Sequence, residues 1–167
     1  VTASTQEWCG QTYMQLNNRD QFEIQVNSYF EGEADQNLKL DKQFLENELF
    51  VKLRINPKEI PQGQMKVIPD FSYLRLQHKS IKAYQAEVKQ TSKNDTLITS
   101  LKYEDIDRIL NIYQDGTFPY QILKWEEKET EADENFTVAT LQKNMRIDYW
   151  NKNSNIFLRL RDSLNLK

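Results

Sequence analysis

Residues 82–90, KAYQAEVKQ, alternate apolar and polar side chains more regularly than any other stretch of the sequence. On an extended chain, the apolar residues from Tyr84 to Val88 lie on one side and the polar residues between them lie on the other. The turn-forming residues SKND follow at 92–95, and a second β-rich run returns at 96–103. This arrangement predicts an antiparallel hairpin that has one apolar face and one polar face.

Similar signals occur on both sides of this hairpin. An Asp-Gly pair at 115–116 separates two β-rich runs, which is typical of a hairpin turn. We therefore interpret 106–113 as a strand, although its apolar spacing also fits a helix face. Strands recur at intervals of roughly 8–14 residues, which indicates an antiparallel meander. The further expected strands are 8–16, 22–30, 64–67, 71–76, 106–113, 118–125 and 136–141.

The sequence contains one clear helix signal, at 41–54. Asp41 is expected to cap its first turn by accepting hydrogen bonds from backbone N–H groups, and Pro57 is expected to stop it. A second, short helix is expected at 153–164. Three leucines repeat at four-residue spacing along the first helix and form one apolar stripe: Leu45, Leu49 and Leu53.

These elements predict a mainly β fold, with α+β as the alternative class. Alternating strands leave one face of the sheet apolar, so the sheet has to curve around something that covers this face. We expect a curved antiparallel sheet or an open β-barrel, with the helix at about 41–54 packed against it. A chain of 167 residues with 38% hydrophobic and 28% charged residues has the size and composition of a globular protein, so we treat 1–167 as a single domain.

The charge balance argues against a nucleic-acid partner. Lys and Arg number 22 against 25 Asp and Glu, which gives a formal charge of −3. Binding to phosphates requires a concentrated basic face, and the densest charge runs, at 126–134, are acidic. These acidic runs are expected to form a solvated loop.

The sequence offers few candidates for catalysis or metal binding. Cys9 and His78 are the single thiol and the single imidazole, and no nucleophile signature surrounds Cys9. Glu31, Glu33 and Asp35 alternate like ligands of a calcium loop, but the glycine and the distal glutamate of such a loop are misplaced. We therefore expect no catalytic residue, no metal site and no cofactor, and the ligand-binding residues stay unassigned.

The aromatic residues are more informative. The chain has eight Tyr, eight Phe and three Trp. Aromatic side chains in alternating strands pair with one another in a core, or they line a concave apolar pocket. The second interpretation predicts a domain that binds a lipid or a hydrophobic segment.

An ordered set of short motifs runs through essentially the whole chain. The motifs are Gln6-Glu7-Trp8-Cys9-Gly10, Gln15-Leu16-Asn17-Asn18-Arg19, Ser28-Tyr29-Phe30-x-x-Glu33, Leu53-Arg54, Pro57, Pro61-x-Gly63, Ile68-Pro69, Arg75-Leu76-x-His78, Lys82-Ala83-Tyr84, Phe118-Pro119-Tyr120, Trp125-Glu126-Glu127 and Tyr149-Trp150-x-x-Asn153-Ser154. The set resembles an uncharacterised family of bacterial cell-envelope lipoproteins, some of whose members carry the label "septum formation inhibitor". In addition, residues 61–127 are similar to envelope domains with a curved open β-barrel, including outer-membrane lipoprotein carriers.

The resemblance implies a location and no known activity. It implies that 1–167 is the C-terminal part of a longer lipoprotein, with a lipid anchor upstream of Val1. Cys9 itself follows the polar Gln6 and Glu7, so it is not the anchor. The expected location is the cell envelope, facing the periplasm or the exterior, with contact to the membrane through the anchor alone.

The residues and the resemblance together favour a non-enzymatic envelope domain that binds a lipophilic ligand or a partner protein. Two alternatives stay open. One is a hydrolase acting on envelope polymers, which would use His78 with a carboxylate or with Cys9. The other is a structural module that completes a sheet with an N-terminal segment and has an unpaired sheet edge here.

Overall fold

The computed structural model describes residues 2–7, 10–33, 35–134 and 136–166. It contains two open, mainly antiparallel sheets, so the predicted mainly β class is confirmed. The first sheet has four strands in chain order, β1 (Thr2–Glu7), β2 (Gly10–Asn18), β3 (Phe22–Ser28) and β4 (Gln36–Leu40). The expected strand at 8–16 corresponds to β2, and its first two residues, Trp8 and Cys9, lie outside the described residues.

The second sheet has seven strands in the order β11-β10-β9-β8-β7-β6-β5. Its neighbours pair antiparallel, except that the two-residue β5 pairs parallel to β6. The hairpin predicted from 82–103 forms its centre, and Tyr84, Ala86 and Val88 are buried as expected. The strands are β5 (Phe44–Leu45), β6 (Gly63–Ile68), β7 (Tyr84–Lys93), β8 (Thr96–Tyr103), β9 (Ile109–Asp115), β10 (Ile122–Lys128) and β11 (Thr137–Thr140).

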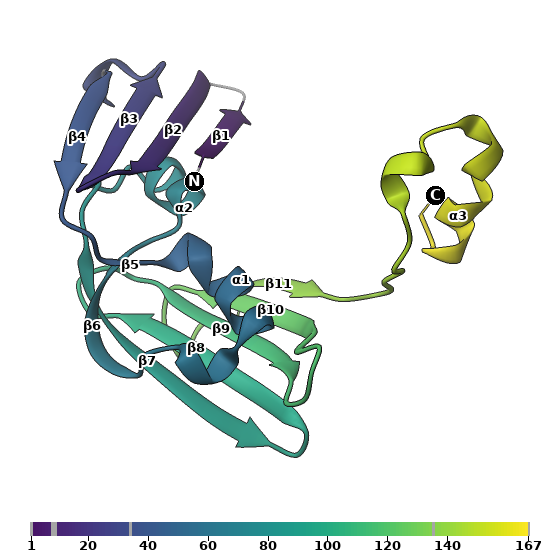
Figure 1. Ribbon diagram of the computed structural model, residues 1–167. Helices are drawn as coiled ribbons and strands as arrows, with labels where there is room; N and C mark the ends of the chain where they lie inside the picture. Colours follow the sequence, from purple (N-terminus) through teal and green to yellow (C-terminus); the bar gives the residue numbers. More distant parts are fainter. Residues whose placement is uncertain (1, 8–9, 34, 135, 167) are drawn as a thin grey trace.

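Helix α1 (Glu46–Ile55) lies across one face of the seven-stranded sheet (Figure 1). Leu49 and Leu53 are fully buried there, and the Gln114 side-chain amide on β9 donates to the Leu53 carbonyl at 3.1 Å. Protein side chains therefore fill the apolar face of this sheet, and a lipophilic ligand requires a site beside α1 rather than beneath it.

The predicted helix begins later than expected. Phe44 and Leu45 pair with β6, so α1 starts at Glu46, and Leu45 is an N-cap without a side-chain hydrogen bond. Asp41 instead accepts a hydrogen bond from the Gln21 amide at 2.9 Å, so its predicted capping role is wrong. The predicted leucine stripe is confirmed for Leu49 and Leu53 on the helix, while Leu45 is buried from β5, and the stop before Pro57 is confirmed.

The strand predicted at 71–76 is wrong, because this segment forms helix α2 (Phe71–Leu76). The Asp70 carboxylate accepts from the backbone N–H groups of Ser72 and Tyr73, at 2.8 and 3.2 Å, and so caps the helix. Local capping therefore overrides the β propensity of the aromatic residues.

The chain between β9 and β10 also differs from the prediction. Tyr120 lies with Phe118 in the turn region, and the strand predicted at 118–125 begins at Ile122. The Gly116 N–H donates to the Asp95 carbonyl at 2.7 Å, and a Cβ at Gly116 would lie 2.9 Å from that oxygen. The glycine is required by this close approach of two turns.

The C-terminal region is less regular than predicted. The helix expected at 153–164 is a 3₁₀ turn at Asn155–Phe157 followed by helix α3 (Arg159–Ser163). Figure 1 shows this region held away from both sheets on an extended connection that follows β11. No helix in the described part of the chain is long and apolar enough to span a membrane.

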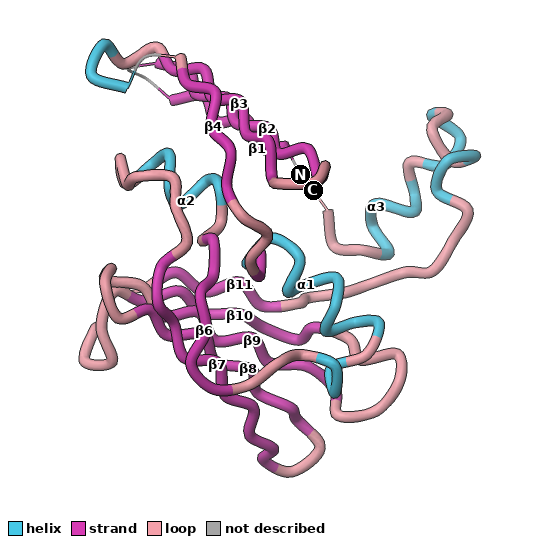
Figure 2. The backbone as a smooth tube through the Cα atoms, turned by 60° about the vertical axis from the view of Figure 1, so that its left-hand side comes forward, coloured by secondary structure: helices cyan, strands magenta, loops and turns pink. Residues whose placement is uncertain are grey.

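One hydrophobic core joins the two sheets. It runs from Met14 and Ile24 in the first sheet through Phe71 and Leu74 of α2 to the leucines of α1. Figure 2 shows α2 between the four-stranded sheet on one side and the seven-stranded sheet on the other. The position of α2 therefore determines how the two sheets meet.

The packing of α1 leads to a stability prediction. Leu53→Ala removes a fully buried side chain beneath the helix, and we expect it to lower the free energy of unfolding by about 2 to 5 kcal/mol. Val51→Ala is the matched control, because Val51 lies on the same helix and is 60% exposed. It should change the free energy of unfolding by less than about 0.5 kcal/mol. Urea unfolding measures both, and equal effects of the two variants would contradict this packing.

Candidate binding site

A charged pair is buried between α1 and the seven-stranded sheet. Arg108 precedes β9 and is 3% exposed, while Glu46 begins α1 and is 2% exposed. The Arg108 Nη2 and Nε atoms donate to Glu46 Oε1 and Oε2 at 2.6 and 3.2 Å, which is a two-pronged contact. The remaining nitrogen, Nη1, pairs with Glu127 on β10.

Two tyrosines complete this cluster. The Tyr103 hydroxyl on β8 donates to Glu46 Oε2 at 2.6 Å. The Tyr73 ring on α2 lies beneath the Arg108 guanidinium, whose central carbon is 4.2 Å from the ring centroid. The cluster therefore ties α1 and α2 to β8, to β10 and to the residue that precedes β9.

The surroundings of Tyr103 and Arg108 favour the form that each group has at neutral pH. Burial raises the pKa of Tyr103 well above its usual value, and the neighbouring Glu46 carboxylate acts in the same direction. Burial alone would lower the pKa of Arg108, but the carboxylates of Glu46 and Glu127 outweigh it and raise this pKa. A neutral phenol and a permanent cation are both poorly suited to moving protons at neutral pH.

A cavity of about 310 Å³ opens beside this cluster, and we call it the slot. Phe50 of α1 and Trp125 of β10 form an aromatic wall, with an edge-to-face contact and ring centroids 6.4 Å apart. Its size is at the lower end for a ligand pocket, so the slot suits a compact apolar group rather than a whole lipid. The lining residues are Glu46, Asn47, Phe50, Asp70, Ser72, Arg108, Leu110, Trp125 and Glu127.

The polar part of the slot favours a hydrogen-bond donor. The Asn47 side-chain N–H group pairs with Asp70, whereas its Oδ1 atom is buried and has no partner among the described residues. A buried acceptor without a partner is costly, so a donating ligand would be stabilised there. The lining also carries three carboxylates against one guanidinium, which disfavours a carboxylate ligand.

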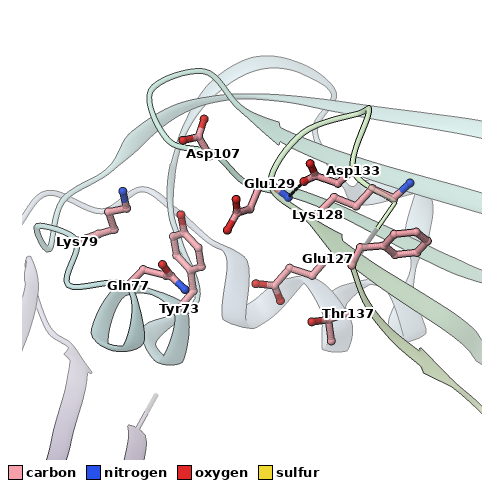
Figure 3. A pocket seen from close by; sticks show the side chains of 10 residues that line it. Tyr73, Gln77, Lys79, Asp107, Glu127, Lys128, Glu129, Asp133 and Thr137 are labelled. Atoms are coloured by element: carbon pink, nitrogen blue, oxygen red, sulfur yellow. Dashed lines mark hydrogen bonds between the residues drawn. The ribbon is translucent and has the colours of Figure 1, made fainter.

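A second cavity, of about 390 Å³, shares Glu127 with the slot in its lining, and we call it the acidic pocket (Figure 3). Asp133 accepts from the backbone N–H groups of Glu129 and Thr130 at 2.9 and 2.6 Å, which orders the loop that forms one wall. Its lining residues are Tyr73, Gln77, Lys79, Asp107, Glu127, Lys128, Glu129, Asp133, Phe136 and Thr137.

His78, the histidine that the sequence offered as a candidate base, does not line either cavity. His78, after α2, pairs through Nδ1 with Glu33, which also pairs with the buried guanidinium of Arg75. The Phe30 ring packs edge-on against His78, with centroids 5.2 Å apart. The contact joins the loop after β3 to α2, and Cys9 lies outside the described residues.

The structure describes the side chains of the calcium-loop pattern only in part. Glu33 is engaged by Arg75 and His78, and the side chain of Glu31 is among those not described. Across the part of the chain that the structure describes, no group of three or more His, Cys, Asp or Glu residues is arranged to hold a metal ion.

The sequence analysis missed Glu46 and Arg108, although the sequence contains a signal for each. Glu46 lies three residues before Leu49, so a helix that buries Leu49 also turns Glu46 inward. Arg108 interrupts the apolar run from Ile106 to Leu110. Two opposite charges on surfaces predicted to be buried are a reason to expect a buried pair.

No protein-family model, curated protein or solved structure matches the chain. The assignment of the site therefore depends on its geometry.

The buried pair leads to the second prediction. Arg108→Ala leaves Glu46 buried without its cation, and we expect the free energy of unfolding to fall by about 3 to 5 kcal/mol. Replacing both partners, Arg108→Met with Glu46→Gln, removes the stranded charge and should recover a large part of this loss. Chemical unfolding of the unaltered chain, the two single variants Arg108→Met and Glu46→Gln, and the double variant measures the coupling, and a double variant that is as unstable as the sum of the single changes would contradict the pairing.

Proposed function

We propose that this chain is a non-enzymatic binding domain of the cell envelope, and that the slot holds a compact lipophilic group of a partner molecule. The observation that carries this proposal is an aromatic wall in a cavity that is also lined by Asn47, whose buried side-chain oxygen has no partner among the described residues. The envelope location is supported by the ordered sequence motifs that resemble envelope lipoproteins.

The chemistry of the slot defines the class of ligand. Phe50 and Trp125 provide apolar contact, and Asn47 Oδ1 provides an acceptor. The carboxylates of Asp70 and Glu127 add negative charge to the lining. A lipophilic group that carries an amine or an amide N–H satisfies all three features, whether it belongs to a lipid or to a partner protein.

The ligand class can be tested with two probes of matched size and opposite charge. We expect 4-phenylbutylamine to bind and 4-phenylbutyrate to bind at least about tenfold more weakly, a difference of about 1.4 kcal/mol. Saturation-transfer NMR and calorimetry on the folded chain measure both affinities. Trp125→Ala should weaken the binding of the amine by about tenfold through lost aromatic contact.

Phe118→Ala is the matched control, because Phe118 is an exposed aromatic residue that does not line the slot. It should leave the affinity for the amine unchanged. Equal binding of the two probes, or binding that is insensitive to Trp125→Ala, would overturn the proposal.

The pairing of His78 with Glu33 gives the hydrolase alternative a specific observation. The same carboxylate, however, also neutralises Arg75, which is 4% exposed, so we interpret the group as a contact that holds α2 to the first sheet. The structural-module alternative is supported by the open edges of the first sheet at β1 and β4.

Substitutions of Arg75 and of His78 test whether their contact with Glu33 is structural or catalytic. Arg75→Ala should destabilise the chain by about 3 to 5 kcal/mol, because it strands the partly buried Glu33. His78→Ala should change stability by less than about 1 kcal/mol, since its ring is half-exposed. An activity screen on peptidoglycan and polysaccharide substrates is expected to show no hydrolysis, and any hydrolysis lost specifically on His78→Ala would favour the hydrolase.

A further inference from the structure

The C-terminal segment 141–166 does not bury any of its residues. Residues 145–166 include ten apolar residues, and the most exposed are Tyr149 at 74%, Trp150 at 66% and Ile156 at 78%. The tail, as we call 141–166, is hydrogen-bonded to the second sheet at its start, where the Leu141 N–H donates to the Leu123 carbonyl at 2.8 Å, and its helical part stands away from both sheets in Figure 1. Ordering so many residues without a core costs more than their mutual contacts return, so the tail requires a surface to fold against.

The charge of the tail indicates what kind of surface this is. Residues 141–167 contain six Lys or Arg and two Asp, an excess of four positive charges. Residues 1–140 contain 16 Lys or Arg and 23 Asp or Glu, an excess of seven negative charges. The tail is therefore complementary to the rest of this same chain. An anionic membrane would attract the tail and repel the rest of the chain.

The acidic pocket is the surface whose charge is complementary to that of the tail. Four carboxylates line it, from Asp107, Glu127, Glu129 and Asp133, against the two ammonium groups of Lys79 and Lys128. Figure 3 shows several of these carboxylates around one opening, with the Tyr73 ring beside them. Tyr73 and the partly buried Phe136 add aromatic surface for an apolar partner such as Trp150.

The path of the chain favours exchange between two copies. The pocket is lined by Phe136 and Thr137, at the start of β11, whereas the tail leaves after Thr140, at the other end of this strand. The tail is thus directed away from the pocket of its own chain. Two copies related by a twofold axis can each place a tail in the pocket of the other, which makes two identical contacts at once.

We infer that the tail of one copy docks into the acidic pocket of a second copy, so that the chain forms a tail-exchanged homodimer. Basic side chains such as Arg146 and Arg159 would pair with the pocket carboxylates, and Trp150 would pack on Tyr73 or Phe136. Glu127 lines both the slot and the acidic pocket, but Asp107, Glu129 and the tail do not line the slot, so the inference can be tested without changing any residue of the slot.

Complementary charge reversals test the inference by sedimentation velocity on the full chain. We expect a dimer at low salt that dissociates as salt screens the contact. The tail variant Arg146→Glu with Arg159→Glu and the pocket variant Asp107→Lys with Glu129→Lys should each be monomeric. Mixing the two variants should restore a dimer, because the acidic tail meets the basic pocket and the unchanged tail meets the unchanged pocket.

The control reverses two exposed charges elsewhere, Arg19→Glu with Lys93→Glu, and should remain dimeric. A chain that is monomeric at all concentrations tested would overturn the inference, and so would a dimer indifferent to both variants. Tail-dependent sedimentation with phosphatidylglycerol vesicles, without a dimer, would overturn it in favour of a membrane surface. Binding of 4-phenylbutylamine should be the same in the tail variant and the control as in the unaltered chain, which separates this test from that of the slot.

Discussion

The buried contact between Glu46 and Arg108 is the constraint on which the rest of the structure depends. Both side chains are almost completely removed from water, so each needs the other to offset its desolvation. The contact holds α1 against the seven-stranded sheet, and the Tyr73 ring beneath the guanidinium holds α2 in the same place. Because α2 lies between the two sheets, one charged pair influences the arrangement of both.

The two cavities follow from this arrangement. Charged side chains cannot pack as densely as the leucines of the core, since each carboxylate and guanidinium has to keep directional partners. The slot and the acidic pocket share Glu127 in their linings. The slot has an aromatic wall, whereas the acidic pocket is rich in carboxylates. Two cavities of different chemistry therefore share a single residue.

The sequence was sufficient for most of the sheets but not for the site. Alternation and turn chemistry predicted the strands around Tyr84 to Val88, because their apolar residues face one core. The strand at 71–76 was predicted wrongly, because a single cap at Asp70 decides the conformation of a short segment. Glu46 and Arg108 are 62 residues apart in the chain, so their pairing depends on the packing of α1 over β9. No local pattern contains that information.

Hydrogen–deuterium exchange with mass spectrometry on the full chain tests the central claim most directly. If the buried pair anchors α1, the amides of 46–55 should exchange as slowly as those of β8 and β9, and the Arg108→Ala variant should accelerate exchange in α1 and α2 together. Rapid exchange of the α1 amides in the unaltered chain would contradict the account. So would faster exchange in the Arg108→Ala variant that is confined to β9, the strand that follows Arg108.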